Sequence, residues 1–135
     1  MSAFIDTNIV VRHLTGDPPD MAAQATAYLG SASELLLTDL VVAETIYVLE
    51  SFYKTSRPQV AEAVRSLIAF SSIITVDPAL LLRAVEVYET DRLDFAEAYL
   101  VASAESTGVN RVASFDTSID RIKTIERVDP ASAAN

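Results

Sequence analysis

The chain has 135 residues, of which half are hydrophobic, and glycine and proline are sparse. This is the size of one ordinary domain, with enough apolar material to build a core without covalent cross-links. Cysteine is absent, which excludes disulfides and thiolate zinc sites. The net charge of −9 argues against a general nucleic-acid binder, which usually carries a basic surface, unless divalent ions neutralise a local group of acids.

Strand-like and helix-like segments alternate along the chain. Short apolar or β-branched segments predict strands at residues 3–5, 35–38, 73–76 and 111–115, with an edge strand at 124–128. Amphipathic segments predict helices at about residues 8–14, 20–29, 39–53, 56–70, 77–88 and 94–106. Asp20 and Asp39 are expected to cap the second and third helices, and Gly108 is expected to end the last one.

This alternation predicts a fold of the α/β class. We expect a three-layer α/β/α arrangement around a central, mostly parallel sheet, in a single domain over residues 1–128. Residues 129–135 are small and are expected to form a short disordered C-terminal tail. No apolar run reaches the ~20 residues that span a bilayer, and the first residues lack the basic region of a signal peptide. We therefore expect a cytoplasmic protein.

Two acids follow predicted strands directly. Asp6 comes after residues 3–5, and Asp116 comes after residues 111–115. In a parallel sheet with helices on both faces, the functional site lies outside the carboxyl ends of the strands. Each acid also has a purely structural interpretation, in which Asp6 caps the next helix and Asp116 closes a turn.

Three further acids lie in predicted helices. Glu44 lies in a stretch that is apolar nearly all round, so we expect it to be buried, at a high energetic cost unless a cation compensates its charge. A partly exposed helix position is the simpler alternative. Asp94 and Glu97 share one face at a helix start, where the dipole favours anions. A capping box would explain that pair without any function.

Together, these acids predict a metal site. Carboxylates gathered at one edge of a sheet repel one another and destabilise the fold. Mg²⁺ or Mn²⁺ would relieve that repulsion, since both prefer oxygen ligands. Such an ion activates a water and polarises a phosphodiester. The pattern therefore favours a phosphodiesterase, and a bound ion would reconcile the acidic composition with a nucleic-acid substrate.

The motifs around these acids resemble the PIN domain family of ribonucleases, over a segment from Phe4 to about Val128. Residues 4–8, Phe-Ile-Asp-Thr-Asn, resemble the strand and Asp-Thr-Asn of the family, and Glu44 is similar to its second acid. Residues 93–102 resemble the third motif, and residues 114–116 resemble the fourth, with Asp120 at the spacing common there. The family usually has Asp where this chain has Glu97, and Asp94 matches an extra acid of a subset, so either could contact metal.

The resemblance implies a Mg²⁺- or Mn²⁺-dependent endoribonuclease of the VapC type, which is the toxin of a type II toxin–antitoxin system and is blocked by a cognate VapB-like antitoxin. Metal would be held by Asp6, by Asp94 or Glu97, and by Asp116. Glu44 would bind metal through water or act as the base. The resemblance also implies supporting roles for two neighbours of Asp6: Thr7 could hydrogen-bond a metal-binding carboxylate, and Asn8 could cap the following helix and touch substrate.

Basic and aromatic residues suggest contacts with larger partners. Four cations could bind RNA phosphates: Arg12, Lys54, Arg57 and Arg92. His13, the only histidine, is expected to have a surface or partly buried role rather than a catalytic one. The segment 40–53, with Tyr47, Phe52 and Tyr53, is too apolar for core packing alone. We expect it to form a homodimer interface or an antitoxin-binding groove.

Two other interpretations fit parts of the sequence. A receiver-type signalling domain has a similar size and an acidic Mg²⁺ pocket, but it needs a lysine at the end of a late strand, and Lys123 precedes one instead. A PIN scaffold without catalysis is the second alternative. The full set of acids argues against it, whereas the Glu at position 97 favours it. A metal titration separates the two, because an inactive scaffold should show no stabilisation by Mn²⁺.

Overall fold

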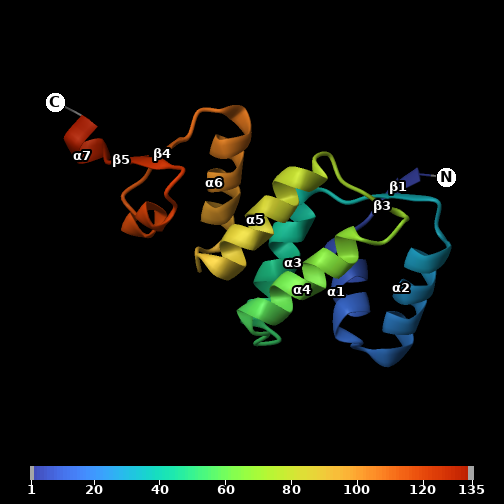
Figure 1. Ribbon diagram of the computed structural model, residues 1–135. Helices are drawn as coiled ribbons and strands as arrows, with labels where there is room; N and C mark the ends of the chain where they lie inside the picture. Colours follow the sequence, from blue (N-terminus) through green and yellow to red (C-terminus); the bar gives the residue numbers. More distant parts are fainter. Residues whose placement is uncertain (1, 134–135) are drawn as a thin grey trace. The chain divides into compact units, whose positions relative to one another are not determined.

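The strands form two parallel sheets in the computed structural model, which describes residues 2–133 (Figure 1). The chain divides into two compact units, Met1–Pro78 and Ala79–Asn135, each with its own sheet. Helices connect and flank the strands in both units. The α/β class with parallel strands, expected from the sequence, is confirmed.

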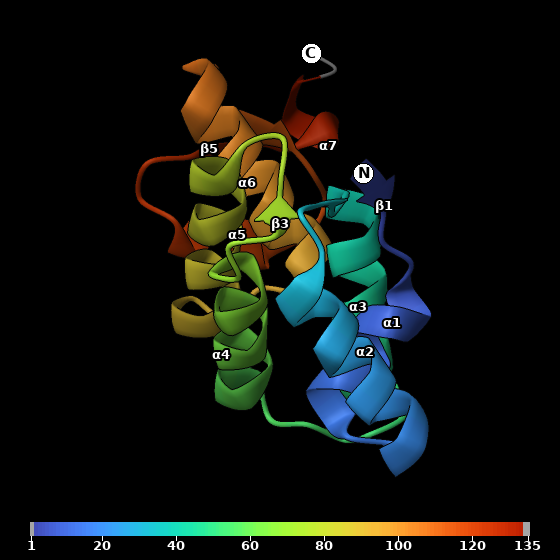
Figure 2. The same ribbon diagram turned by 90° about the vertical axis from the view of Figure 1, so that its right-hand side faces the viewer.

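The first unit holds a three-stranded sheet in the order β1–β2–β3. Its elements are β1 (Ser2–Phe4), α1 (Thr7–Thr15), α2 (Pro19–Ser31), β2 (Glu34–Leu36), α3 (Asp39–Ser51), α4 (Arg57–Ile68) and β3 (Ile73–Ile74). The parallel register pairs Ala3 with Leu35, and Leu35 with Ile73. Helix α1 packs against both α2 and α3, as Figure 1 and Figure 2 show. The packing of α1 on α3 brings the residues after β1 next to the middle of α3.

The second unit holds the two-stranded parallel sheet β4–β5. Its elements are α5 (Pro78–Thr90), α6 (Phe95–Thr107), β4 (Arg111–Ala113), a 3₁₀ turn η1 (Thr117–Arg121), β5 (Glu126–Val128) and α7 (Pro130–Ala133). Helix α6 packs on β4, and η1 packs on β5. Tyr88, Leu93 and Ile119 are among its fully buried side chains. Within residues 2–133, no helix is long and apolar enough to cross a membrane.

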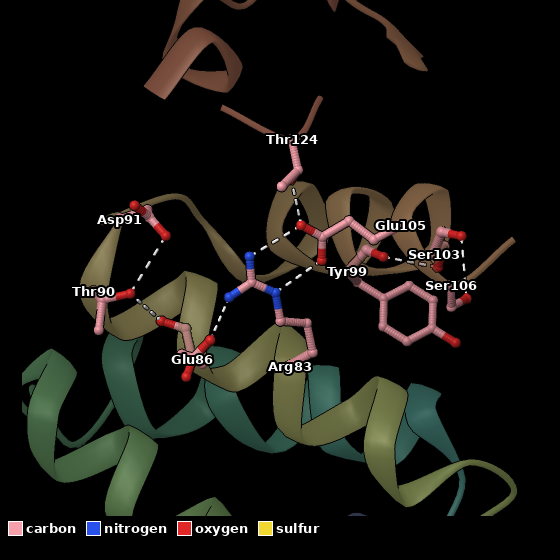
Figure 3. A network of polar contacts seen from close by, with 9 residues as sticks. All are labelled: Arg83, Glu86, Thr90, Asp91, Tyr99, Ser103, Glu105, Ser106 and Thr124. Atoms are coloured by element: carbon pink, nitrogen blue, oxygen red, sulfur yellow. Dashed lines mark hydrogen bonds and ion pairs between the residues drawn. The ribbon is translucent and has the colours of Figure 1, made fainter. Parts of the chain in front are cut away.

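A network of polar contacts joins α5 to α6 (Figure 3). The guanidinium of Arg83 donates to both carboxylate oxygens of Glu105, over 2.8 and 3.0 Å. Thr124 donates to the same carboxylate, and Arg83 also pairs with Glu86 one turn along α5. The network fixes α6 relative to α5 and to the segment before β5, so it also fixes the acids at the start of α6.

Two predicted helix caps are wrong by one or two positions. Asp20 does not cap α2, which begins after Pro18 with Asp20 in its first turn. Proline at the first helical position has the φ angle of a helix and needs no partner for a missing N–H, so the helix starts earlier. Asp39 is already helical, and the hydroxyl of Thr38 accepts from the N–H of Val41 instead. The predicted end of α6 at Gly108 is confirmed, with a left-handed φ of 77°.

Four strands, β2 to β5, are shorter than the sequence predicts, and β3 and β4 show the reason. Strand β3 ends at Ile74, and β4 ends at Ala113, although the apolar runs continue to Val76 and Phe115. Val76 is 94% exposed and Phe115 is 78% exposed. Strands β3 and β4 end at the residues that pair with the last residues of β2 and β5. Hydrophobicity alone does not predict where a partner strand ends. In the predicted tail, residues 130–133 form the helix α7, and residues 134–135 lie outside the described part of the chain.

Candidate functional site

Asp6 lies at the junction between β1 and α1. Its side-chain Oδ1 accepts from the backbone N–H of Thr7 over 2.7 Å, and its extended backbone makes it the N-cap of α1. The structural interpretation from sequence therefore holds. The carboxylate is nevertheless exposed, and one hydrogen bond leaves most of its acceptor positions available. Capping fixes the direction of this carboxylate and leaves acceptor positions for another ligand.

Thr7 connects the start of α1 to the middle of α3. Its buried hydroxyl donates a hydrogen bond to Oε1 of Glu44. The predicted burial of Glu44 is wrong, because this side chain is exposed. Helix α3 buries one stripe of its surface, formed by Val42, Thr45, Ile46 and Leu49, and leaves the opposite side open. A helix that is apolar all round was expected to be enclosed, but neither Leu40, at 78% exposed, nor Tyr47, at 68%, is covered.

A cavity of about 430 Å³ lies beside these two acids, within the first unit. It is lined by Asp6, Thr7, Asn8, Val11, Arg12, Glu44, Val48, Phe52 and Tyr53. The predicted capping role of Asn8 is wrong, since Asp6 caps α1 and Asn8 is its second residue. Among residues 2–133, no acidic side chain forms an ion pair with Arg12. The cavity thus combines carboxylates, a cation and aromatic rings on one side of α1.

A second group of acids lies in the second unit, around the start of α6. Oδ1 of Asp94 accepts from the N–H of Glu97 over 2.8 Å and caps the helix. The side chain of Glu97 turns instead toward η1, where the hydroxyl of Ser118 donates to its Oε2 over 3.1 Å. Asp116 caps η1 through the N–H of Ser118, over 2.9 Å. The sequence-predicted acids Asp94, Glu97 and Asp116 are therefore neighbours.

The carboxyl groups of Glu97 and Asp116 shift each other's protonation. Burial raises the pKa of Glu97, and its hydrogen bond to Asp116 and the charge of Asp94 raise it further. The pKa of Asp116 falls to about 2, because the side chain and the backbone N–H of Ser118 and the side chain of Glu97 all stabilise its charged form. A cation placed between the two carboxyl groups would oppose both the burial cost and the repulsion.

Residues 3–125 match the family model of the PIN domain. The chain belongs to the PIN domain family. This is a family of metal-dependent nucleases, and membership removes the receiver-type interpretation. A search among curated proteins finds no significant match.

The acids expected of a PIN domain divide between the two units. Asp6 and Glu44 belong to the first, and Asp94, Glu97 and Asp116 belong to the second. Within either unit, the described residues contain no group of three acidic or histidine side chains arranged to hold a metal ion. Asp120 is not part of the second acid group, because it accepts from Arg127 over 3.0 Å.

The predicted RNA-binding cations differ in their settings. Lys54 and Arg92 are exposed and have left-handed backbones, with φ of 54° and 58°. Arg57 is half-buried in the first turn of α4, whereas Arg12 lines the cavity. The only histidine, His13, is half-buried and bonded to Thr26 over 2.8 Å, and burial lowers its pKa. It does not line the cavity beside Asp6.

Sequence reasoning missed two sets of residues in this PIN domain. Ser118 donates to both Glu97 and Asp116, and its signal was the spacing Asp-x-Ser, which is typical of a turn closed by the aspartate side chain. Phe52 was assigned to an interface with another protein, but it lines the cavity with Asp6 and Glu44. The spacing of Glu44, Val48 and Phe52, four residues apart, could have indicated one common helix face.

Proposed function

We propose that this PIN domain is a Mg²⁺- or Mn²⁺-dependent endoribonuclease that hydrolyses RNA phosphodiester bonds. The observation that carries the proposal is the carboxyl pair formed by Glu97 and Asp116, with Asp94 beside it. Ser118 donates to both carboxylates, and partial burial and the neighbouring acids raise the pKa of Glu97, so such a pair makes sense as half of a cation site. Family membership supplies the reaction class.

The donor chemistry of the acid groups fits a hard divalent cation. All of the candidate ligands are oxygen donors, which suits Mg²⁺ and Mn²⁺ better than softer metals. Mg²⁺ is usually held by one or two carboxylates, with waters and substrate phosphates filling the other positions. The pair of Glu97 and Asp116 therefore offers enough protein ligands for such an ion.

Each acid has a proposed role. Asp6 is a proposed metal ligand in the first unit. Glu97 and Asp116 are proposed metal ligands in the second unit, and we favour Glu97 over Asp94 because Ser118 donates to both Glu97 and Asp116. When bound, the cation supplies an activated water and neutralises charge on the phosphodiester. Glu44 would orient that water or accept its proton, and Thr7 would keep the Glu44 carboxylate in place.

The biological role that we propose is that of a VapC-type toxin in the cytoplasm, held inactive by a cognate antitoxin. The exposed apolar side chains of α3, Leu40 and Tyr47, support a protein-binding surface that serves a homodimer or the antitoxin. Ultracentrifugation over a range of concentrations, together with a pull-down of the product of any adjacent reading frame, tests this role. A monomer at all concentrations that captures no partner would contradict it.

Cleavage of total RNA by the purified protein tests the enzymatic proposal. We expect fragments with Mg²⁺ or Mn²⁺, none with EDTA, and none from Asp6→Asn. Asparagine caps a helix as well as aspartate does, so this variant should keep its fold. If the wild-type protein neither cleaves RNA nor gains thermal stability from Mn²⁺, the chain is a PIN scaffold without catalysis.

A further inference from the structure

The side chains of η1 divide among three faces of this short turn. A 3₁₀ helix has three residues per turn, so side chains at positions i and i+3 lie above one another. Ile119 and Ile122 form one such pair, and both are buried. Asp120 lies on a second face, where it pairs with an arginine of β5. Ser118 and Arg121 form the third face, so they lie on the same side of η1.

This third face of η1 is bonded to the segment that leads into α6. The hydroxyl of Ser118 donates to Oε2 of Glu97 over 3.1 Å. Nη1 of Arg121 donates to two backbone carbonyls, that of Asp91 over 3.2 Å and that of Arg92 over 3.3 Å. Both carbonyls lie just beyond the C-terminal end of α5, where the helix dipole favours a cation. Two side chains of η1 therefore hold this segment, one at the turn before α6 and one in its first helical turn.

The turn that Arg121 holds has a strained backbone. Arg92 adopts a left-handed φ of 58°, which residues other than glycine and asparagine rarely adopt. Such a conformation persists only where the surrounding structure holds it. The next residue, Leu93, is 1% exposed, and Asp94 then caps α6. The place of Glu97 at the start of α6 therefore depends on a turn that the guanidinium of Arg121 fastens.

We propose that Arg121 is a positioning residue: its hydrogen bonds to the turn before α6 hold Glu97 beside Asp116, so that one divalent cation can contact both. The inference rests on the proposed function and adds a residue that touches neither the metal nor the substrate.

The positive charge of Arg121 acts in the opposite direction. After Ser118 and Glu97, this charge contributes to lowering the pKa of Asp116. A charge close enough to stabilise the Asp116 carboxylate also repels a cation bound there. Loss of Arg121 should therefore weaken metal binding if the residue positions the acids, and strengthen it if only its charge matters. The direction of the change in metal affinity separates the two explanations.

Titration of the metal-free protein with Mn²⁺ alone tests the inference, with the rise in the thermal midpoint as the readout. Arg121→Met keeps an unbranched side chain at this exposed position and removes both the donors and the charge. We expect it to need about ten-fold more Mn²⁺ than wild type for the same rise, as for other groups that orient metal ligands. Arg121→Lys keeps a donor for the carbonyls and should recover most of the affinity. Lys123→Met, the matched control, removes an equal charge from an exposed position two residues after η1 and should not weaken binding.

Cleavage of RNA over a range of Mn²⁺ concentrations completes the test. Excess Mn²⁺ should restore most of the rate of Arg121→Met, because its acids are intact and only the occupancy of the metal site is reduced. A midpoint that is lower without Mn²⁺ but has the wild-type Mn²⁺ dependence overturns the proposal, because Arg121 then only stabilises the fold.

Two further results would overturn the positioning role and leave the nuclease in place. The first is equal or tighter Mn²⁺ binding by Arg121→Met, which leaves only a charge effect. The second is a raised KM for RNA that excess Mn²⁺ does not correct, which assigns Arg121 to the substrate. Failure of the proposed function appears differently, as wild-type protein that neither gains stability from Mn²⁺ nor cleaves RNA, and that result overturns both proposals.

Discussion

The two acid groups of the molecule differ in what surrounds their carboxylates. In the first unit, Asp6 and Glu44 accept hydrogen bonds from Thr7 and line a cavity with aromatic walls. In the second unit, Ser118 donates to both Glu97 and Asp116, and burial and the neighbouring acids raise the pKa of Glu97. The first group is satisfied by donors from Thr7. In the second group, a nearby cation would favour the charged form of Glu97.

The difference follows from the local backbone around each group. Asp6 and Thr7 open a regular helix, which directs an N–H and a hydroxyl at the two acids. Asp116 opens a 3₁₀ turn, whose tight geometry brings Ser118 back to it and places Asp116 against Glu97. Similar acids can therefore be satisfied by donors or be placed beside other acids, depending on the backbone around them.

The largest effect on RNA cleavage should come from removing the negative charge of Asp116. Asp116→Asn keeps an acceptor for the N–H of Ser118 but loses the negative charge, so we expect cleavage to fall by about 100-fold or more. The measurement is the initial rate of RNA cleavage in Mg²⁺. Asp120→Asn is the matched control on the same turn, since Asp120 pairs with Arg127, and it should retain most activity.

A smaller effect should come from the hydrogen bond in the first group. Thr7→Val fills the same buried space but cannot donate to Glu44, so we expect cleavage to fall by about ten-fold, as for other groups that orient a catalytic carboxylate. Thr7→Ser keeps the hydroxyl and should restore the rate. Equal activity of all three proteins would show that Thr7 only stabilises the fold.

The network that positions the second group predicts a pH effect on stability. The hydrogen bonds from Arg83 lower the pKa of Glu105 below its unfolded value of about 4.3. Its contribution is therefore present above that pH and is lost as the pH falls through the folded pKa. Solvent screens the half-exposed Arg83, so we expect Glu105→Gln to lower the free energy of unfolding by about 1 kcal/mol at neutral pH.

Urea denaturation at neutral pH and near pH 3 measures this difference. The gap between wild type and Glu105→Gln should shrink as the pH falls through the folded pKa of Glu105. Glu86→Gln, which removes the more exposed partner of Arg83, serves as the control and should have a smaller effect at both pH values. A gap that is constant with pH would mean that packing, rather than charge, explains the role of Glu105.

The smallest effect is expected on thermal stability, when the carboxyl group of Glu97 is removed. In the absence of metal, Glu97→Gln removes a carboxyl whose pKa is raised and keeps an acceptor for Ser118, so the thermal midpoint should rise by about 1–2 °C. The variant should also lose the stabilisation that Mn²⁺ gives to the wild-type protein. Glu62→Gln, at an exposed position of α4, is the control and should change neither quantity.

The sequence predicted the order of the elements and the acids, because hydrophobic periodicity and caps are local features. Asp6, Asp94 and Gly108 all occupy helix ends as expected. The exposure of Glu44 could not be predicted in the same way. The composition of α3 shows that it is apolar, but only tertiary packing decides which side is covered, and here Leu40 is left in water.

The details of the second group were also beyond sequence reasoning. The end of β4 depends on where its partner strand stops, and that end sets the turn that carries Asp116. The contact between Glu97 and Asp116 depends in turn on how α6 and η1 face each other. Spacing along the chain identifies candidate acids, whereas their partners and pKa shifts arise from contacts between distant segments.

The central claim is that Asp6 and Asp116 are both needed for the proposed metal-dependent hydrolysis, and a double-mutant cycle on RNA cleavage tests it most directly. The rates of wild type, Asp6→Asn, Asp116→Asn and the double variant are measured in the same Mg²⁺ concentration. Residues that act as a unit are strongly non-additive, so the double variant should be about as slow as the slower single variant. A single variant that keeps full activity would contradict the claim, and losses that multiply would show that the two acids contribute independently.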